Sequence, residues 1–274
     1  MTRNILTIVA AFVATSFTLG AQSSDFSNWT DQQKEEFLLA AKVTGRRSIG
    51  IGITDSRRLT LVFNGISHDA HFQNIEVFKP VFESAQGKEL NFRDSYQFNI
   101  AAYRLDRLIG LHLLPVSVPF KDGRSHGAAT WWIDNVKMME LDRHRSGEVP
   151  PNQEEWNDQM YNVRVFNELV YNTDPNLGNV LITNDWLPVP IDFTRGFRRQ
   201  TTLRRAENLV RIDRRVYEGL KNLSEETLTA AIGSLISKPE LRGVLARRDA
   251  ILAVFDRRIA EQGVSAVICE RPGH

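Results

Sequence analysis

Apolar and polar residues are arranged in blocks along the chain, and the spacing within each block predicts an element. Between residues 25 and 42, apolar side chains recur at helical spacing around Thr30, a good N-cap, which predicts a short first helix. From residue 45 to 79, short apolar runs alternate with turn residues such as Asn64-Gly65. We therefore expect three antiparallel strands there, at 48–53, 59–63 and 75–79.

A second block of helix and strand completes the first half of the chain. Residues 93–110 place apolar side chains on one helical face and end at Gly110, which is typical of a helix stop. Two β-rich runs, 116–120 and 128–133, then flank the turn-like residues 121–124. The pattern therefore predicts a unit of five strands and one helix.

The second half of the chain has mainly helical patterns. A polar connector at 134–153 contains Pro150-Pro151, and a helix is expected from about residue 154 to 171. Apolar positions recur with helical period at 220–236 and 239–259. An antiparallel sheet followed by separate helices is the pattern of an α+β protein.

Between these helices lies a short segment whose polar residues carry chemistry. It contains Asp174, Asn176 and Asn179, and two short apolar stretches separate it from Asp192. The stretches are short enough to pair as a hairpin, which would bring Asn179 and Asp192 to the same end of the ribbon. Side-chain oxygens gathered there suit a hard divalent cation such as Mg²⁺.

The order of elements and the series Asp174, Asn179, Asp192 resemble the protein-kinase-like superfamily. The segment 172–179 with Ile191-Asp192 is similar to the atypical members, the HipA-type bacterial serine kinases and the phosphatidylinositol 3/4-kinase-like proteins. The resemblance covers residues 48–197. It implies a two-lobed protein-kinase-like fold, with a small lobe of five antiparallel strands and one helix and a larger, mainly helical lobe.

The resemblance implies a role for each residue of the series. Asp174 matches the carboxylate that orients the acceptor hydroxyl and takes its proton, Asn179 the amide that binds magnesium, and Asp192 the metal-binding carboxylate. Asn176 lies within the same catalytic segment. Taken singly, Asp and Asn are also typical turn residues, so an Asx-turn stays open as the alternative for Asp174 and Asn176, and a simple turn residue for Asp192.

The resemblance also implies a nucleotide site upstream of the series. Lys79 resembles the strand lysine that pairs with the α- and β-phosphates. Gly50, Gly52 and Ser56 lie where these kinases fold a loop over the phosphates, and the backbone from Ile133 onward is the candidate for contacting adenine. A solvent-facing lysine and glycines that mark a β-bulge are the alternatives.

The helix at 93–110 departs from the kinase pattern. Where a Glu should face the lysine, the sequence has Asn99, whose amide can orient Lys79 through a hydrogen bond but cannot form an ion pair. Glu83, Glu89 or Asp94 could supply the missing charge from a neighbouring loop. The departure leaves a pseudokinase scaffold, which binds a nucleotide without catalysis, as the alternative to an active enzyme.

Composition narrows the class of protein only slightly. The 274 residues are 42% hydrophobic and 24% charged, as in an ordinary globular protein, and the net charge of +1 gives no reason to expect nucleic acid as a partner. Cys269 is the single cysteine, in a region expected to be a tail, so an internal disulfide is excluded.

The N-terminus has the composition of a secretory signal. A basic residue near the start precedes an apolar run at 5–19 and a small-residue exit at 20–24. We therefore expect an exported protein, periplasmic or secreted, with an uncleaved membrane anchor as the alternative. The expected divisions are a signal peptide at 1–21, an N-terminal helical extension at 22–44, an N-lobe at 45–134, a C-lobe at 135–265 and a tail at 266–274.

These features lead to one main hypothesis. We expect a kinase-fold phosphotransferase that uses ATP with Mg²⁺ or Mn²⁺ and transfers the γ-phosphoryl group to a hydroxyl of a protein, lipid or small molecule. A metal-dependent hydrolase that uses the same oxygen ligands is a further interpretation. Contact with a membrane is expected only if the leader remains attached.

Overall fold

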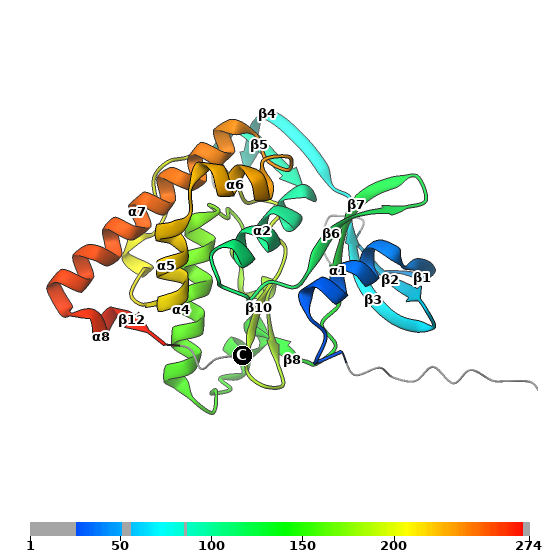
Figure 1. The fold of residues 1–274 in the computed structure, drawn as a ribbon, viewed down its shortest axis with the longest axis horizontal. Helices are drawn as coiled ribbons and strands as arrows, with labels where there is room; N and C mark the ends of the chain where they lie inside the picture. Colours follow the sequence, from blue (N-terminus) through cyan, green and yellow to red (C-terminus); the bar gives the residue numbers. More distant parts are fainter. Residues whose placement is uncertain (1–25, 51–55, 85–86, 271–274) are drawn as a thin grey trace, which may run out of the picture.

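The computed structural model describes residues 26–50, 56–84 and 87–270. The chain forms two lobes, a small one built on an antiparallel sheet and a larger one built mainly from helices (Figure 1). This is the α+β class that the order of patterns predicts, with the two lobes that the kinase resemblance implies.

The small lobe contains a five-stranded antiparallel sheet. Its strands follow the order β1-β2-β3-β7-β6, with β1 at Lys42–Ser48, β2 at Arg57–Phe63, β3 at Ile66–Gln73, β6 at Ser117–Asp122 and β7 at Ser125–Trp131. Alternate strand residues such as Leu59 and Ala70 are fully buried on one face. Helix α1 (Asp31–Ala40), which Thr30 caps as predicted, covers this face with Phe37 and Leu38.

The third strand of this sheet differs from the prediction. Asn64 and Gly65 have positive φ angles of 50° and 77°, typical of the tight turn that here joins β2 directly to β3. The run at 75–79 instead starts a separate hairpin of β4 (Glu76–Ser84) and β5 (Gly87–Ser95). Residues 66–73 carry several polar side chains, so their alternation is not visible as an apolar run.

The first strand also lies earlier than expected. The prediction places it at 48–53, whereas β1 ends at Ser48 and residues 51–55 lie outside the described part of the chain. The strand begins as soon as α1 ends, because Ala41 already has an extended backbone. Helix and sheet therefore follow one another without a linker.

Helix α2 (Gln97–Leu108) runs beside the sheet and contacts both hydrophobic cores. Its residues Phe98 and Leu105 lie in the core of the larger lobe, whereas Tyr103 lies in the core under the sheet. The helix ends before Gly110, whose φ of 71° suits a helix stop. The predicted amphipathic helix is thus confirmed, and it joins the two lobes.

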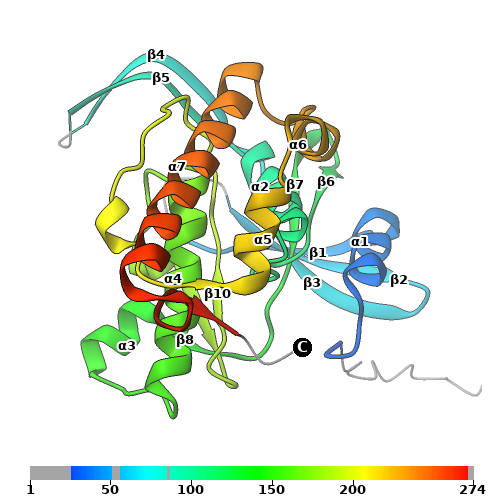
Figure 2. The ribbon, with the colours of Figure 1, turned by 60° about the vertical axis from the view of Figure 1, so that its left-hand side comes forward.

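Helices make up most of the larger lobe. They are α3 (Glu140–Ser146), α4 (Gln153–Leu169), α5 (Arg214–Asn222), α6 (Glu225–Ile232), α7 (Lys238–Gln262) and α8 (Val264–Val267). Their apolar faces enclose the largest core, to which Phe166, Val216 and Phe255 belong. Helix α7 runs along the outside of the lobe, and its first turn reaches the β4–β5 hairpin through an ion pair between Glu240 and Arg93 (Figure 2).

Short elements complete the larger lobe. One small sheet has the order β10-β9-β8, with β8 at Val136–Met139, β9 at Val180–Thr183 and β10 at Pro188–Pro190, and two 3-10 helices span Leu177–Asn179 and Ala206–Asn208. Strands β11 (Ile212–Asp213) and β12 (Ile268–Cys269) pair in parallel. Cys269, expected in a tail, is therefore a buried strand residue. No helix in the described ranges is both long and apolar enough to cross a bilayer.

Candidate functional site

The predicted hairpin is present and places Asn179 beside Asp192. Strands β9 and β10 pair in antiparallel fashion, with Val180 opposite Pro190. Just beyond this pair, the Ile191 N–H donates to the Asn179 carbonyl at 2.9 Å. The residue before β9 and the second residue after β10 therefore lie at the same end of the ribbon.

Turn hydrogen bonds shape the Asp174 loop, which we define as residues 172–179. The Asp174 N–H donates to Asn172 Oδ1 at 3.0 Å, and Asn179 Nδ2 donates to the Asp174 carbonyl at 3.4 Å. From an exposed position, Asn176 Nδ2 donates to Asp174 Oδ1 at 3.1 Å. The loop does contain an Asx-turn, but its acceptor is Asn172, and the Asp174 side chain stays 46% exposed.

The Asp192 carboxylate is held by the residue two positions later. Asp192 has a positive φ of 58°, uncommon outside glycine, and its Oδ1 accepts from Thr194 Oγ1 at 2.9 Å. Burial of the carboxyl group raises the pKa of Asp192 above its usual value. The carboxylates of Asp94 and Asp174 raise this pKa further, against the lowering effect of the Thr194 hydrogen bonds.

The donor set at this end of the hairpin fits a hard divalent cation. Because Asn179 Nδ2 is used by the Asp174 carbonyl, its Oδ1 remains for an ion, and Asp192 adds a carboxylate. Within the described ranges, no three His, Cys, Asp or Glu residues cluster as a metal site. A magnesium ion at a nucleotide typically takes one or two protein ligands and completes its shell with phosphate oxygens and water.

A chain of buried amides connects the sheet, helix α2 and the segment after Asp192. Asn99 Nδ2 donates to Gln73 Oε1 at 2.8 Å, and Asn99 Oδ1 accepts from the Phe193 N–H at 2.7 Å. The backbone N–H can only donate, so it fixes which end of the Asn99 amide faces it. A neutral Gln–Asn pair therefore occupies the place where the kinase resemblance implies a Lys–Glu ion pair.

Lys79 is not the partner of Asn99, contrary to the prediction. It lies on β4 in the separate hairpin, where its side chain is exposed and its Nζ lies 5.0 Å from the ring centroid of Phe82. Gln73, the last residue of β3, is the partner of Asn99 instead. The error follows from the strand order, because the turn at 64–65 makes β3 the third strand of the sheet.

The carboxylates considered as substitutes for the missing Glu all serve other residues. The ion pairs are Glu83 with Lys88 at 2.8 Å, Glu89 with Arg198 at 2.5 Å and Asp94 with Arg195 at 3.0 Å. None of these three acids pairs with Lys79 in the described part of the chain. None of the three therefore supplies Lys79 with the negative charge that the missing Glu would have given it.

The other residues predicted to contact the nucleotide lie in two segments, one between β1 and β2 and one between β7 and β8. Gly50, with a φ of 65°, and the buried Ser56 lie on either side of residues 51–55, which are outside the described part of the chain, and the Ile49 N–H donates to the Ser56 carbonyl at 3.1 Å. Gly52 lies outside the described residues. Ile133 lies between β7 and β8 and packs against the sheet core. Contact of these residues with a nucleotide stays a prediction.

Arg195 and Asp94 complete the site as an ion pair that the sequence did not predict. Arg195 Nε donates to Asp94 Oδ2 at 3.0 Å, and Arg195 Nη1 lies 3.7 Å from Asp174 Oδ2. Asp94 is buried at the end of β5, immediately before helix α2. The available signals were modest: an acid in the first residues of a predicted helix and a base three residues after Asp192.

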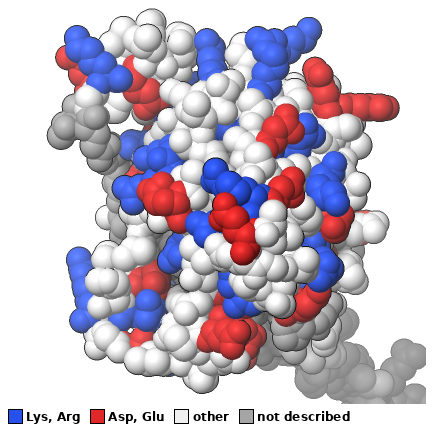
Figure 3. Space-filling model, turned by 90° about the vertical axis from the view of Figure 1, so that its left-hand side faces the viewer, with Lys and Arg blue, Asp and Glu red and all other residues white. Residues whose placement is uncertain are grey.

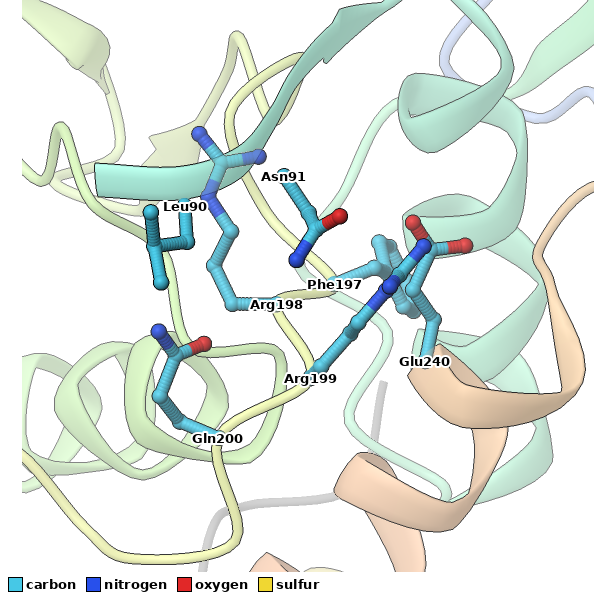
Figure 4. Close-up of a pocket in the computed structure, with 7 residues that line it drawn as sticks. All are labelled: Leu90, Asn91, Phe197, Arg198, Arg199, Gln200 and Glu240. Carbon is cyan, nitrogen blue, oxygen red and sulfur yellow. The ribbon is translucent and has the colours of Figure 1, made fainter. Parts of the chain in front are cut away.

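A cavity of about 270 Å³ opens where the β4–β5 hairpin meets the Asp192 segment, which we define as residues 192–200 (Figure 4). Its lining comprises Leu90, Asn91, Phe197, Arg198, Arg199, Gln200 and Glu240. The buried Arg198 pairs with Glu89 and donates from Nη2 to Thr173 Oγ1 at 3.4 Å. One side chain thus links the wall of the cavity to the Asp174 loop.

Comparison with protein-family models and with curated proteins gives no match. Among solved structures, a hydra Fam20 protein with a sugar matches at a TM-score of 0.64 and 14% identity, over 86% of this chain and 90% of that chain. The Golgi casein kinase with Mn and ADP bound matches at 0.59 and 13%, over 89% and 81%. The Helicobacter pylori proinflammatory kinase CtkA matches at 0.51 and 9%, over 82% and 98%.

These matches cover most of each chain at low sequence identity, so what they show is a shared fold. The chain has an atypical protein-kinase-like fold. The matches give no support to the narrower resemblance to the HipA-type and phosphatidylinositol-kinase-like branches.

Proposed function

We propose that this protein is a phosphotransferase that transfers the γ-phosphoryl group of ATP to a hydroxyl of a protein, lipid or small molecule, with Mg²⁺ or Mn²⁺ as cofactor. The observation that carries the proposal is the convergence of Asp174, Asn179 and Asp192 at one end of the β9–β10 hairpin. The match to a Golgi casein kinase with Mn and ADP bound supports a nucleotide and a divalent ion as ligands.

Each residue of this group has a separate task in the proposed reaction. Asp174 orients the acceptor hydroxyl and takes its proton, for which its partly exposed carboxylate is suited. Asn179 and Asp192 hold the cation, which when bound supplies positive charge to the phosphate oxygens. Catalysis by such a site rests on positioning and electrostatics rather than on covalent chemistry.

The Gln73–Asn99 pair changes how the nucleotide is held. Gln73, which accepts from Asn99, is neutral and carries no charge with which to neutralise a phosphate. The cation held by Asn179 and Asp192 must then neutralise more of the phosphate charge. We therefore propose that nucleotide affinity depends strongly on the divalent ion.

The same pair favours one alternative function. A pseudokinase scaffold would keep the fold and bind a nucleotide without transferring phosphate, and loss of the ion pair is a change expected in such a protein. The retained Asp174 argues for catalysis, since a scaffold has no need of a hydroxyl-orienting carboxylate. Activity measurements separate the two.

The test is transfer of label from γ-labelled ATP with a divalent ion present, to an acceptor mixture or to the protein itself. Wild-type protein is expected to transfer label, and Asp174→Ala is expected to lower the rate by ~10²–10⁴-fold, the usual contribution of a general base. Asp185→Ala is the matched control, because Asp185 is an exposed acid on the turn of the same hairpin.

Three outcomes are distinct. Nucleotide binding without transfer in the wild type would indicate the scaffold. Release of labelled phosphate to water as the sole product would indicate a metal-dependent hydrolase. Equal transfer by wild type and Asp174→Ala would remove Asp174 from the reaction.

Export is a separate proposal that rests on the N-terminal pattern. We propose that residues 1–21 direct the chain out of the cytoplasm and are then removed. Sequencing the N-terminus of the protein recovered from its native host tests this. An intact Met1 on a cytoplasmic protein would contradict it.

A further inference from the structure

Arg195 lies between two acids that come from different parts of the chain. Its Nε donates to Asp94 Oδ2 at 3.0 Å, and its Nη1 lies 3.7 Å from Asp174 Oδ2. The Arg195 side chain is 36% exposed, whereas that of Asp94 is only 6% exposed. One guanidinium therefore spans from the end of strand β5 to the Asp174 loop.

The backbone around Arg195 is fixed on both sides. Thr173 donates to the Arg195 carbonyl from its N–H at 3.3 Å and from its Oγ1 at 3.1 Å. The Ser95 N–H donates to the Thr194 carbonyl at 3.0 Å. Because these bonds hold the main chain against both the Asp174 loop and β5, the guanidinium is not a loosely placed surface group.

Asp94 explains why the guanidinium stays in this place. A buried carboxylate is costly without a cation, and Arg195 is the base with which Asp94 forms its ion pair. The pair uses the Nε edge of the guanidinium, which leaves the terminal nitrogens for other contacts. Asp94 thus holds Arg195 by one edge and directs Nη1 towards Asp174.

The Asp174 carboxylate is then contacted at both oxygens. Asn176 Nδ2 donates to Oδ1, and Arg195 lies on the side of Oδ2. Each carboxylate oxygen has two acceptor directions, so these contacts restrict rotation and leave room for an acceptor hydroxyl. A side chain that is partly exposed would otherwise sample several rotamers.

We propose that Arg195 is a positioning residue for Asp174, and that Asp94 fixes Arg195 in turn. The inference rests on the proposed phosphotransferase function. It assigns Arg195 to the orientation of the acceptor hydroxyl through Asp174. It does not assign Arg195 to the binding of the nucleotide.

The test compares kcat with nucleotide affinity in a set of variants. Arg195→Ala is expected to lower kcat by about 10- to 100-fold, the range for loss of a hydrogen bond or ion pair to a charged group. The dissociation constant of the nucleotide, measured by calorimetry with the divalent ion present, should stay within about twofold. Arg195→Lys should recover part of kcat because a cation is kept, and Asp94→Asn should lower kcat in the same direction as Arg195→Ala.

A double-mutant cycle distinguishes positioning from general damage. In an Asp174→Asn background, Arg195→Ala should change the residual rate by less than about threefold, because its target is already removed. Arg214→Ala is the control, since Arg214 forms an exposed ion pair with Glu270 near the C-terminus and should keep the wild-type rate.

The possible failures can be told apart. An equal loss from Arg195→Ala in the wild-type and Asp174→Asn backgrounds would overturn the positioning role alone, as would a loss of nucleotide affinity that accounts for the lower rate. Absence of label transfer by the wild type would overturn the proposed function, and the catalytic role of Arg195 with it.

Discussion

Asn99 uses its side-chain amide in both directions, which only a neutral residue can do. Its oxygen accepts from the Phe193 N–H and its nitrogen donates to Gln73. An ionised carboxylate at this position could only accept, so it could not donate to Gln73, and burying its charge would be costly. At the scale of single residues, Gln73 and Asn99 therefore belong together, and changing either one removes the hydrogen bond between them.

Removing the Asn99 amide should therefore destabilise the folded state. Asn99→Ala is expected to lower the free energy of unfolding by about 1–3 kcal/mol, because it removes the hydrogen bonds that Asn99 makes with Gln73 Oε1 and with the buried Phe193 N–H. Urea unfolding followed by circular dichroism measures the change. Asn157→Ala, which removes the same group from an exposed position on α4, should stay within about 0.5 kcal/mol. Equal stability of the Asn99→Ala variant and the wild type would show that the amide pair does not stabilise the fold.

The sequence predicts the polar residues of the site better than their partners. Asp174, Asn179 and Asp192 could be grouped because a short hairpin converts their spacing into proximity. The partner of Asn99 could not be named, because it depends on a strand whose polar residues hide its alternation. Arg195 and Asp94 lie far apart in the chain, and only the folded structure brings them together.

At the scale of elements, helix packing depends on one glycine. Gly219 lies on α5 against the end of α2, and a Cβ atom there would meet the backbone of Ile109. Glycine is usually a poor helix residue, by roughly 1 kcal/mol relative to alanine. Its presence here is explained by the close approach of the two helices.

This packing predicts an unusual response to alanine. Gly219→Ala is expected to lower the free energy of unfolding by about 1–3 kcal/mol instead of raising it, because overpacking outweighs the gain in helix propensity. Thermal or urea unfolding measures the effect. The neighbouring exposed position gives the control, with Glu218→Ala expected within about 0.5 kcal/mol. A more stable Gly219→Ala variant would mean that the helices can separate at no cost.

Element types were easier to predict than their pairing. The amphipathic pattern of α2 and its stop at Gly110 follow from local periodicity, which the structure confirms. Strand pairing is non-local, and the turn at Asn64-Gly65 decides whether 66–73 or 75–79 becomes the third strand. The apolar run at 75–79 is the stronger signal in the sequence, so the prediction chose it in place of residues 66–73.

At the scale of the whole molecule, both lobes contribute to the site. Gln73 comes from the sheet, Asp174 and Asp192 come from the larger lobe, and α2 lies between them. The face crossed by α7 shows basic and acidic side chains interspersed, in keeping with a net charge of +1 (Figure 3). The chain passes between the lobes more than once, because Phe98 and Leu105 of α2 lie in the core of the larger lobe and the sheet strands β6 and β7 follow α2 in sequence.

A ligand bound between the lobes should stabilise the whole protein. With ADP and Mg²⁺ at about 100 times the dissociation constant, the expected gain is ~2.7 kcal/mol, or a rise in Tm of ~5–10 °C for a chain of this size. Differential scanning fluorimetry measures it. Removing the metal with EDTA, or Asp192→Ala with the metal present, should abolish most of the shift. A shift that survives both treatments would place the nucleotide elsewhere or show that the ion is dispensable.

The contact between β3, α2 and Phe193 is made by uncharged groups, which affects the salt concentrations and pH values at which it persists. Added salt weakens an ion pair through screening, and acid removes the charge from a glutamate, whereas amides neither attract counterions nor titrate in the physiological range. The hydrogen bonds that Asn99 makes with Gln73 and Phe193 should therefore be insensitive to high salt concentration and to mildly acidic pH. If the protein is exported, this contact would persist in surroundings where salt concentration and pH vary.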